Sequence, residues 1–121
     1  MVTENPAVQF FAGRPDGSAV AAEVSRVVSA LGPHDVRVSR SQVAFRRRTG
    51  FAYLWRPGQY VASDVPAVLS IALPREVASP RWKEVVHPSA RAWMHHLELR
   101  TPCEVDAEVR DWLGEAYDAA G

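Results

Sequence analysis

Hydrophobic residues recur with two different periods along the chain, and the first of them predicts a helix. Between Ser18 and Leu31, valines and a leucine fall at i, i+4, i+7, i+8 and i+11, the spacing of one face of an amphipathic helix. Gly32-Pro33 ends this helix, because glycine suits the left-handed position after a helix and proline cannot continue it. Asp16 and Ser18 are alternative N-caps. Residues 1–12 are predicted to form an N-terminal arm.

Downstream of this helix the period changes to two, which indicates strands with one covered face. Apolar and polar residues alternate over 36–39 and again over 43–46. Thr49-Gly50 is a plausible turn into the apolar run at 51–55. Prolines flank the run AVLSIAL at 67–73, which is typical of a strand well inside a sheet.

Two further segments open with a cap and a proline. Ser79-Pro80 fits an N-cap followed by the first helical position, and it predicts a short helix that reaches Val86. Thr101-Pro102-Cys103-Glu104 has the spacing of a capping box, with Asp106 as a competing cap. A helical stripe then runs from Val105 to Ala120.

These elements predict an α+β fold in the order α-β-β-β-β-(short α)-β-α. Short strands joined by short loops favour a two-layer arrangement, with an antiparallel sheet of about five strands and the N- and C-terminal helices packed on one face. A chain of 121 residues, 47% of them hydrophobic, can bury a core without staples. No linker or repeat divides it, so we expect a single domain at 1–121, with its body at 13–121 after the arm.

The stretch WMHHLELR at 93–100 places two histidines next to each other. As a strand, it sends His95 to the helix-covered face with Trp93 and Leu97, and His96 to the opposite face with Glu98. A pair that faces opposite ways cannot chelate one ion. His95 is therefore interpreted as a core imidazole, and His96 as surface or as part of a binding site.

The outer face of the predicted sheet, away from the helices, is the candidate binding surface. The strand at 51–55 is apolar on both faces, so the helices leave one set of its side chains uncovered. Such a surface with a few polar groups suits a ligand groove or a dimer interface, although ordinary amphipathic surface is an alternative. The residues expected to take part are Gln42, Arg46, Arg48, Tyr53, Ser70, His96 and Glu98.

Arginines at 46 and 48 would share one face of a strand and could grip a phosphate or a carboxylate. The alternative is a solvated hairpin end that discourages pairing between sheet edges.

The sequence lacks the motifs that mark several common kinds of catalytic and metal site. There is no glycine-rich phosphate loop and no G-x-S-x-G elbow, and one cysteine with scattered histidines does not supply a zinc site. We therefore expect no catalytic residue, no metal and no cofactor. The first residues do not form a secretory signal, and the longest apolar run is about half of the roughly 20 residues that a membrane span needs. We expect a cytoplasmic protein that does not enter membranes.

Charge argues against a general affinity for polyanions, because the formal net charge is zero. It is unevenly distributed: 14–56 holds eight arginines against three acids, a balance of +5, and 101–121 holds six acids against one arginine, a balance of −5. Nucleic-acid binding stays an alternative, with base stacking by an aromatic side chain. Its residues would be Arg37, Arg40, Arg46 and Arg48, with Tyr53 or Trp55.

Longer stretches of the chain resemble a known family. FFAGRP, VRVSRSQVAFRRRTGFAYLW, IALPREVASPRWKEVV, WMHHLELR and DAEVRDWLGEAYDAA resemble domain of unknown function 5655, from about Phe10 onward. The order of elements is also similar to that of the YjbR-like proteins, whose two-layer fold is grouped with secretion chaperones. The first resemblance implies a fold and no established reaction. Its members also occur fused behind nuclease-like or other domains, which implies an accessory or recognition role.

Three functions follow as hypotheses. The first is a small, non-enzymatic binding or interaction module that uses the outer face for a second copy of itself, a separate protein partner or a small anionic ligand. The second is a nucleic-acid-binding accessory domain. The third is an unrecognised enzyme or small-molecule carrier that uses His96 and Glu98.

Overall fold

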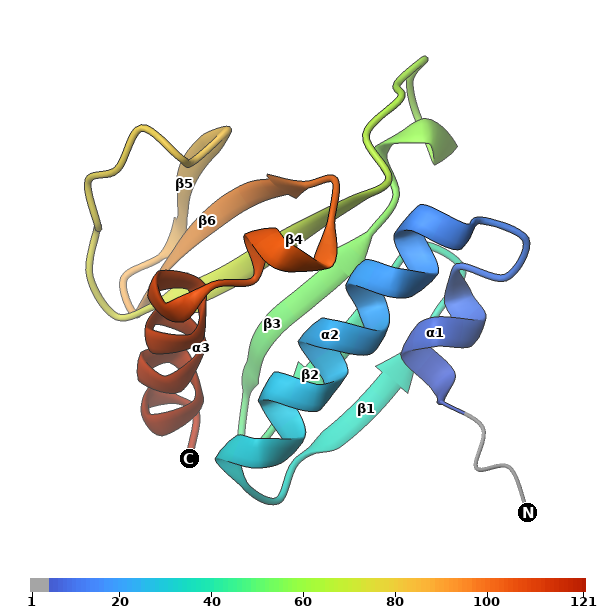
Figure 1. Cartoon of the computed structure of the whole chain (residues 1–121). Coiled ribbons are helices and arrows are strands. Elements are labelled where there is room, and N and C mark those ends of the chain that lie inside the picture. The colour runs from blue at the N-terminus through green and yellow to red at the C-terminus, as the bar shows by residue number, and fades with distance from the viewer. Residues whose placement is uncertain (1–4) are drawn as a thin grey trace.

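The computed structural model describes residues 5–121, and their elements alternate much as the hydrophobic pattern predicts. Along the chain they are α1 (Pro6–Phe10), α2 (Pro15–Leu31), β1 (Asp35–Val38), β2 (Val43–Arg46), β3 (Gly50–Trp55), the 3₁₀ turn η1 (Pro57–Gln59), β4 (Ala67–Leu73), β5 (Glu84–Ser89), β6 (Ala92–Leu99), the 3₁₀ turn η2 (Pro102–Glu104) and α3 (Ala107–Ala119). Figure 1 shows this order in colour.

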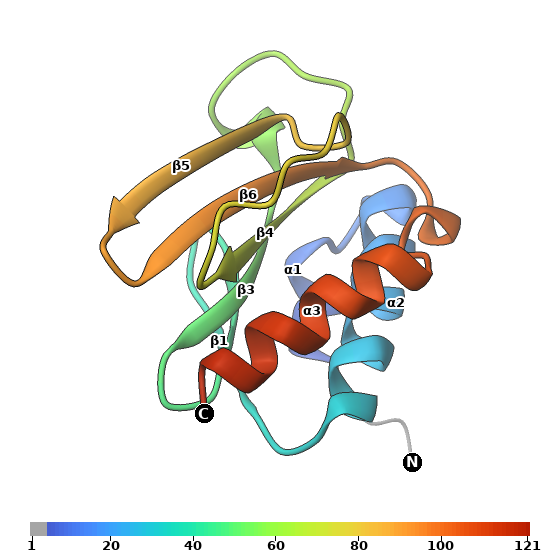
Figure 2. The same cartoon turned by 90° about the vertical axis from the view of Figure 1, so that its left-hand side faces the viewer.

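The strands form one antiparallel sheet, and within the described residues it has six of them in the order β1-β2-β3-β4-β6-β5. Figure 2 shows the three helices on one side of this sheet. The predicted α+β architecture, with N- and C-terminal helices on one face, is therefore confirmed. The sheet has one strand more than the five or so expected.

The extra strand replaces the short helix that Ser79-Pro80 predicted. Pro80 lies in a turn, and β5 pairs with β6 in the register Glu84↔His96 and Val85↔His95. β-branched residues favour a strand here, and pairing with β6 supplies bonds that a single helical turn could not. Pro88 is tolerated because β5 is an edge strand whose register shifts between Val86 and Ser89.

Both long helices bury the stripes that the sequence predicts. Val20, Val24 and Val28 of α2 are fully buried, and each contributes on the order of 1.5–3 kcal/mol relative to an exposed position. The helix begins at Pro15, three residues before the predicted Ser18, and neither proposed cap is used, because no side chain caps its first turn. The Ser18 hydroxyl instead donates to the carbonyl of Phe11 at 2.9 Å.

The start of α3 resolves the choice between two caps. Thr101 to Glu104 form only η2, where Glu104 Oε1 accepts the N–H of Thr101 at 2.9 Å. Asp106 caps the helix, because its Oδ1 accepts the N–H of Val109 at 3.2 Å. Residues assigned to the N-terminal arm also contribute to the fold, since α1 lies there and Phe11 is fully buried.

The three arginines at 46–48 do not continue one strand. β2 ends at Arg46, and the next residues turn against the end of α3. Arg47 donates from Nη1 to the carbonyl of Tyr117 at 2.8 Å, and its guanidinium lies 4.0 Å from the centre of that ring. The N–H groups of Arg48 and Thr49 both donate to the carbonyl of Ala120. The prediction that Arg46 and Arg48 share a strand face is therefore wrong, because unpaired carbonyls at the end of α3 hold this turn.

His95 lies in the core with both of its ring nitrogens bonded, as the alternation of β6 predicts. It is fully buried, Nε2 accepts the N–H of Val77 at 3.0 Å, and Nδ1 therefore carries the proton toward the carbonyl of Trp93 at 2.9 Å. The ring of Trp82 packs 4.8 Å from it and 4.2 Å from the ring of Trp112. This tryptophan pair connects the loop 74–83 to both the sheet and α3.

Candidate functional site

A row of paired residues crosses the outer face of the sheet and forms the floor of the candidate site. Ala44, Tyr53, Ser70 and His96 are successive register partners on β2, β3, β4 and β6. The side chains of Ala44 and Ser70 are small and buried, with 8% and 3% of each residue exposed. Because small residues alternate here with large ones, the face is hollowed between Tyr53 and His96.

The resulting cavity, which we name the outer pocket, has a volume of about 400 Å³. It is lined by Ser41, Gln42, Tyr53, Trp55, Tyr60, Ser70, Met94 and His96. Aromatic rings form its walls: Trp55 makes edge contacts with Tyr60 and His96, at 6.3 and 6.0 Å between ring centres. These walls are typical of a site for an organic molecule.

The loop between β3 and β4 carries one wall of the outer pocket. Trp55 ends β3, and η1 follows at once and brings Tyr60 over the sheet. The side-chain amide of Gln59 donates to the carbonyl of Arg40 at 2.8 Å, which fixes this loop to the turn before β2. Tyr60 nevertheless leaves 60% of its surface exposed. An exposed aromatic ring beside a cavity is available for contact with a ligand.

A chain of hydrogen bonds beside the outer pocket joins Trp55, Ser70 and His96. The indole N–H of Trp55 donates to Ser70 Oγ at 2.9 Å, and Ser70 Oγ lies 2.6 Å from His96 Nδ1. The serine hydroxyl accepts from Trp55, and it has both a proton and a second lone pair for His96 Nδ1. When the serine donates its proton to Nδ1, the neutral imidazole carries its own proton on Nε2.

His96 Nε2 has no partner among the described residues. No residue in 5–121 forms a hydrogen bond with it, and Ser25 Oγ is the sole buried side-chain N or O atom of those residues that lacks a partner. His96 Nε2 is consequently accessible rather than buried. His96 also lines the outer pocket, so its imidazole is available to whatever occupies that cavity.

Burial is the main cause that lowers the pKa of His96 below its ordinary value, while the carboxylate of Glu84 on β5 acts in the opposite direction. The folded protein thus keeps this imidazole neutral at pH values where a histidine of the unfolded chain takes up a proton.

This lowered pKa predicts a pH dependence of stability. Below about pH 6.5, the usual pKa of histidine, the unfolded chain binds more protons than the folded one. The free energy of unfolding therefore decreases as the pH is lowered from there to the lowered pKa of His96. We expect His96→Gln to flatten the profile below about pH 6.5. Urea unfolding at a series of pH values below about 6.5 measures the change, and an identical slope in wild type and His96→Gln contradicts the prediction.

Comparison with known proteins assigns a family but no activity. Domain of unknown function DUF5655 matches residues 7–120, nearly the whole chain. The chain belongs to the DUF5655 family. No curated protein and no solved structure matches it, so the similarity to YjbR-like proteins stays a prediction.

In this DUF5655 protein, the structure brings together only some of the residues that the sequence grouped on the outer face. Gln42, Tyr53, Ser70 and His96 all line the outer pocket. Glu98 is half-buried on the same face, opposite Val68, but it lies outside the cavity. Arg46 is also outside it, and Arg48 lines a different cavity beside the end of α3.

Four other residues complete the outer pocket of this DUF5655 domain. Trp55 and Met94 follow from alternation, since they share faces with Tyr53 and His96. Trp55 was named only as a possible stacking residue for nucleic acid, and nothing in the sequence singled out Met94 as a ligand contact. Ser41 and Tyr60 lie on loops, and no pattern signals their approach. Glu84 was missed as the register neighbour of His96 because its segment was predicted to be helical.

Residues 5–121 of the DUF5655 protein hold neither a candidate metal site nor a helix that could span a membrane. No cluster of three or more histidine, cysteine, aspartate or glutamate side chains there is arranged to hold a metal ion. None of the helices in that part combines the length and the apolar character that crossing a membrane requires.

Proposed function

We propose that this protein is a non-enzymatic binding module whose outer pocket takes a small organic ligand with a planar apolar part and a carboxylate. The observation that carries the proposal is the imidazole of His96, which lines a cavity with aromatic walls and is bonded through Nδ1 to Ser70 and so to Trp55. With Ser70 as the donor in that bond, Nε2–H is the group that His96 offers to a ligand. Preorganised donors of this kind fix the orientation of a ligand, and the surrounding apolar surface supplies affinity.

The lining of the outer pocket supports this class of ligand. Neutral His96 and the side-chain amide of Gln42 offer N–H donors, and the pocket contains no carboxylate that would repel an anion. Trp55 and Tyr60 offer ring surfaces for a flat apolar group. A volume of about 400 Å³ suits a molecule of one or two rings.

The geometry favours binding over hydrolysis by a serine–histidine pair. Ser70 is 3% exposed, and its oxygen already accepts the indole N–H of Trp55, which makes it a poor nucleophile. His96 contacts it through Nδ1, and among the described residues no carboxylate bonds to the imidazole to complete a triad. Glu98, the partner that an enzyme using His96 would need, lies outside the cavity.

The same face also supports the alternatives in which it contacts a second copy of the chain or a separate protein. Support for nucleic-acid binding is weaker, because Arg47 is committed to the end of α3 and Arg46 and Arg48 are not aligned on one strand. We also propose a cytoplasmic location, and the single cysteine supports it, since a chain that can form no internal disulfide fits a reducing compartment.

Aromatic carboxylates test the proposed ligand class. Benzoate, 1-naphthoate and indole-3-acetate are titrated into wild type, His96→Phe and the control His87→Phe by heteronuclear NMR, with acetate and 1-naphthalenemethanol as partial ligands. His96→Phe keeps a ring but removes the donor, so we expect a dissociation constant about ten-fold higher, and no change for the control.

A wild type that binds none of these carboxylates, or a His96→Phe variant that binds them equally well, refutes the proposal. Light scattering on the same samples identifies the alternative occupant: a dimer that Tyr60→Glu dissociates would show that a second copy covers this face.

A further inference from the structure

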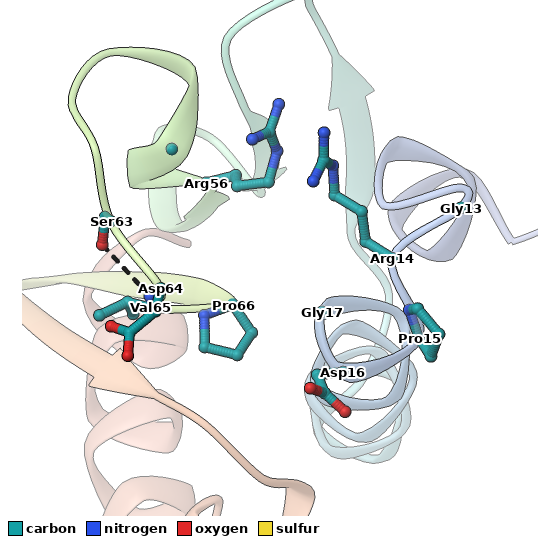
Figure 3. Close-up of a pocket in the computed structure, with 11 residues that line it drawn as sticks. Gly13, Arg14, Pro15, Asp16, Gly17, Arg56, Ser63, Asp64, Val65 and Pro66 are labelled. Atoms are coloured by element: carbon teal, nitrogen blue, oxygen red, sulfur yellow. Dashed lines mark hydrogen bonds between the residues drawn. The ribbon is translucent and has the colours of Figure 1, made fainter.

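Two arginines from opposite walls share a second cleft, on the other side of the β3–β4 loop from the outer pocket. Arg14 precedes α2, and Arg56 follows β3. Both line a cavity of about 360 Å³, which shares no lining residue with the outer pocket. Figure 3 shows the two guanidinium groups converging on one end of this cleft. We name it the arginine cleft.

Neither guanidinium has a partner within the described residues. Side-chain carboxylates pair with Arg26, Arg75, Arg81 and Arg100. No ion pair or side-chain hydrogen bond reaches Arg14 or Arg56 from residues 5–121. Two like charges that converge without a counter-charge repel each other, and an anion between them removes that cost.

The acidic residues that line the arginine cleft do not supply the missing counter-charge. In Figure 3 the carboxylates of Asp16 and Asp64 point away from the guanidinium groups. Asp64 Oδ1 lies 3.4 Å from Arg100 Nη2, so it has another cation beside it. The end of the cleft that holds the two arginines is therefore positive.

Local structure limits the direction of one arginine. A Cβ atom at Gly58 would lie 2.9 Å from Arg56 Nη1, so the guanidinium packs directly on the glycine backbone. A side chain at position 58 would displace it.

We propose that the arginine cleft binds a phosphate-type oxyanion held between Arg14 and Arg56. Two guanidinium groups that approach from opposite walls carry a charge of +2, of which a carboxylate, with a charge of −1, neutralises only half. A phosphate group offers at least three oxygens and a charge near −2, which matches two arginines. The ligand class is thus a small phosphorylated molecule or free phosphate.

Inorganic phosphate tests the site, and phenyl phosphate, acetate and chloride at matched ionic strength define its chemistry. Heteronuclear NMR follows wild type, Arg14→Gln and Arg56→Gln, with Arg91→Gln as the control for loss of an exposed arginine elsewhere. We expect saturable shifts in 13–17 and 56–66, a dissociation constant about ten-fold higher in each cleft variant and unchanged in the control, and acetate binding about ten-fold weaker than phosphate.

Gly58→Ala supplies a second test, because it keeps both charges and moves only Arg56. It should also raise the dissociation constant for phosphate, by several-fold. Shifts that never saturate in wild type, an affinity of Arg14→Gln or Arg56→Gln equal to that of wild type, or unchanged affinity in Gly58→Ala would each overturn the proposal. Acetate that binds as tightly as phosphate would overturn the ligand class. Tighter binding of phenyl phosphate than phosphate identifies a phosphorylated molecule rather than the free ion.

Discussion

Replacement of Trp112 by alanine is expected to lower the free energy of unfolding by about 3–5 kcal/mol, the range for a large buried aromatic side chain. Trp112 is 7% exposed and packs 4.2 Å from the ring of Trp82, which in turn covers His95. Its removal leaves a cavity on α3 and withdraws support from the loop 74–83. Urea unfolding followed by far-ultraviolet circular dichroism measures the change without relying on tryptophan fluorescence.

Trp93→Ala is the matched control for the loss of a tryptophan. The Trp93 ring stacks at 3.7 Å on His87, which is exposed at the end of the β5–β6 hairpin, and the tryptophan itself is only half-buried. We expect it to lose less than half as much stability as Trp112→Ala. Equal losses in the two variants would show that the tryptophan pair has no special role in joining the two layers.

Replacement of Ser70 by alanine is expected to cost about 1–3 kcal/mol in the free energy of unfolding, because the indole N–H of half-buried Trp55 loses its acceptor on the buried Ser70. The same change frees His96 Nδ1, so the neutral imidazole should populate both tautomers. Urea unfolding measures the first effect. Nitrogen-15 NMR of the imidazole measures the second, with wild type expected in the Nε2–H form.

Ser41→Ala provides the comparison, since it removes a hydroxyl from the same cavity that bonds to neither Trp55 nor His96. Its effect on stability should stay within about 0.5 kcal/mol. If Ser70→Ala leaves both the stability and the tautomer of His96 as in wild type, the hydrogen-bond chain does not organise the outer pocket.

Helices and strands of this fold could be predicted from the sequence wherever one hydrophobic period persists over many residues. The stripe of α2 and the alternation along β6 were both read correctly, because a buried face imposes its spacing on the sequence. The helix predicted at Ser79-Pro80 does not form, because an N-cap residue followed by proline is a local and weak signal. Pairing of Glu84 and Val85 with β6 overrides it, and no short-range pattern reports such a pairing.

Only those residues of the outer pocket that lie on strands could be predicted from the sequence. Alternation placed Tyr53, Ser70 and His96 on one face, and register then made them neighbours. The position of Tyr60 depends on how the loop after β3 folds back, which depends on tertiary contacts such as the bond from Gln59 to Arg40. Arg46 and Arg48 were misplaced because the chain leaves the strand to meet the end of α3.

Adjacent histidines on β6 give an imidazole to either face, so a slip of this strand by one residue would still put a histidine in the core. Leu97 and Leu99 would then move into water, and Glu98 would have to enter the apolar interior without a cation. Glu98, which takes no part in the outer pocket, therefore disfavours a register of β6 that is shifted by one residue.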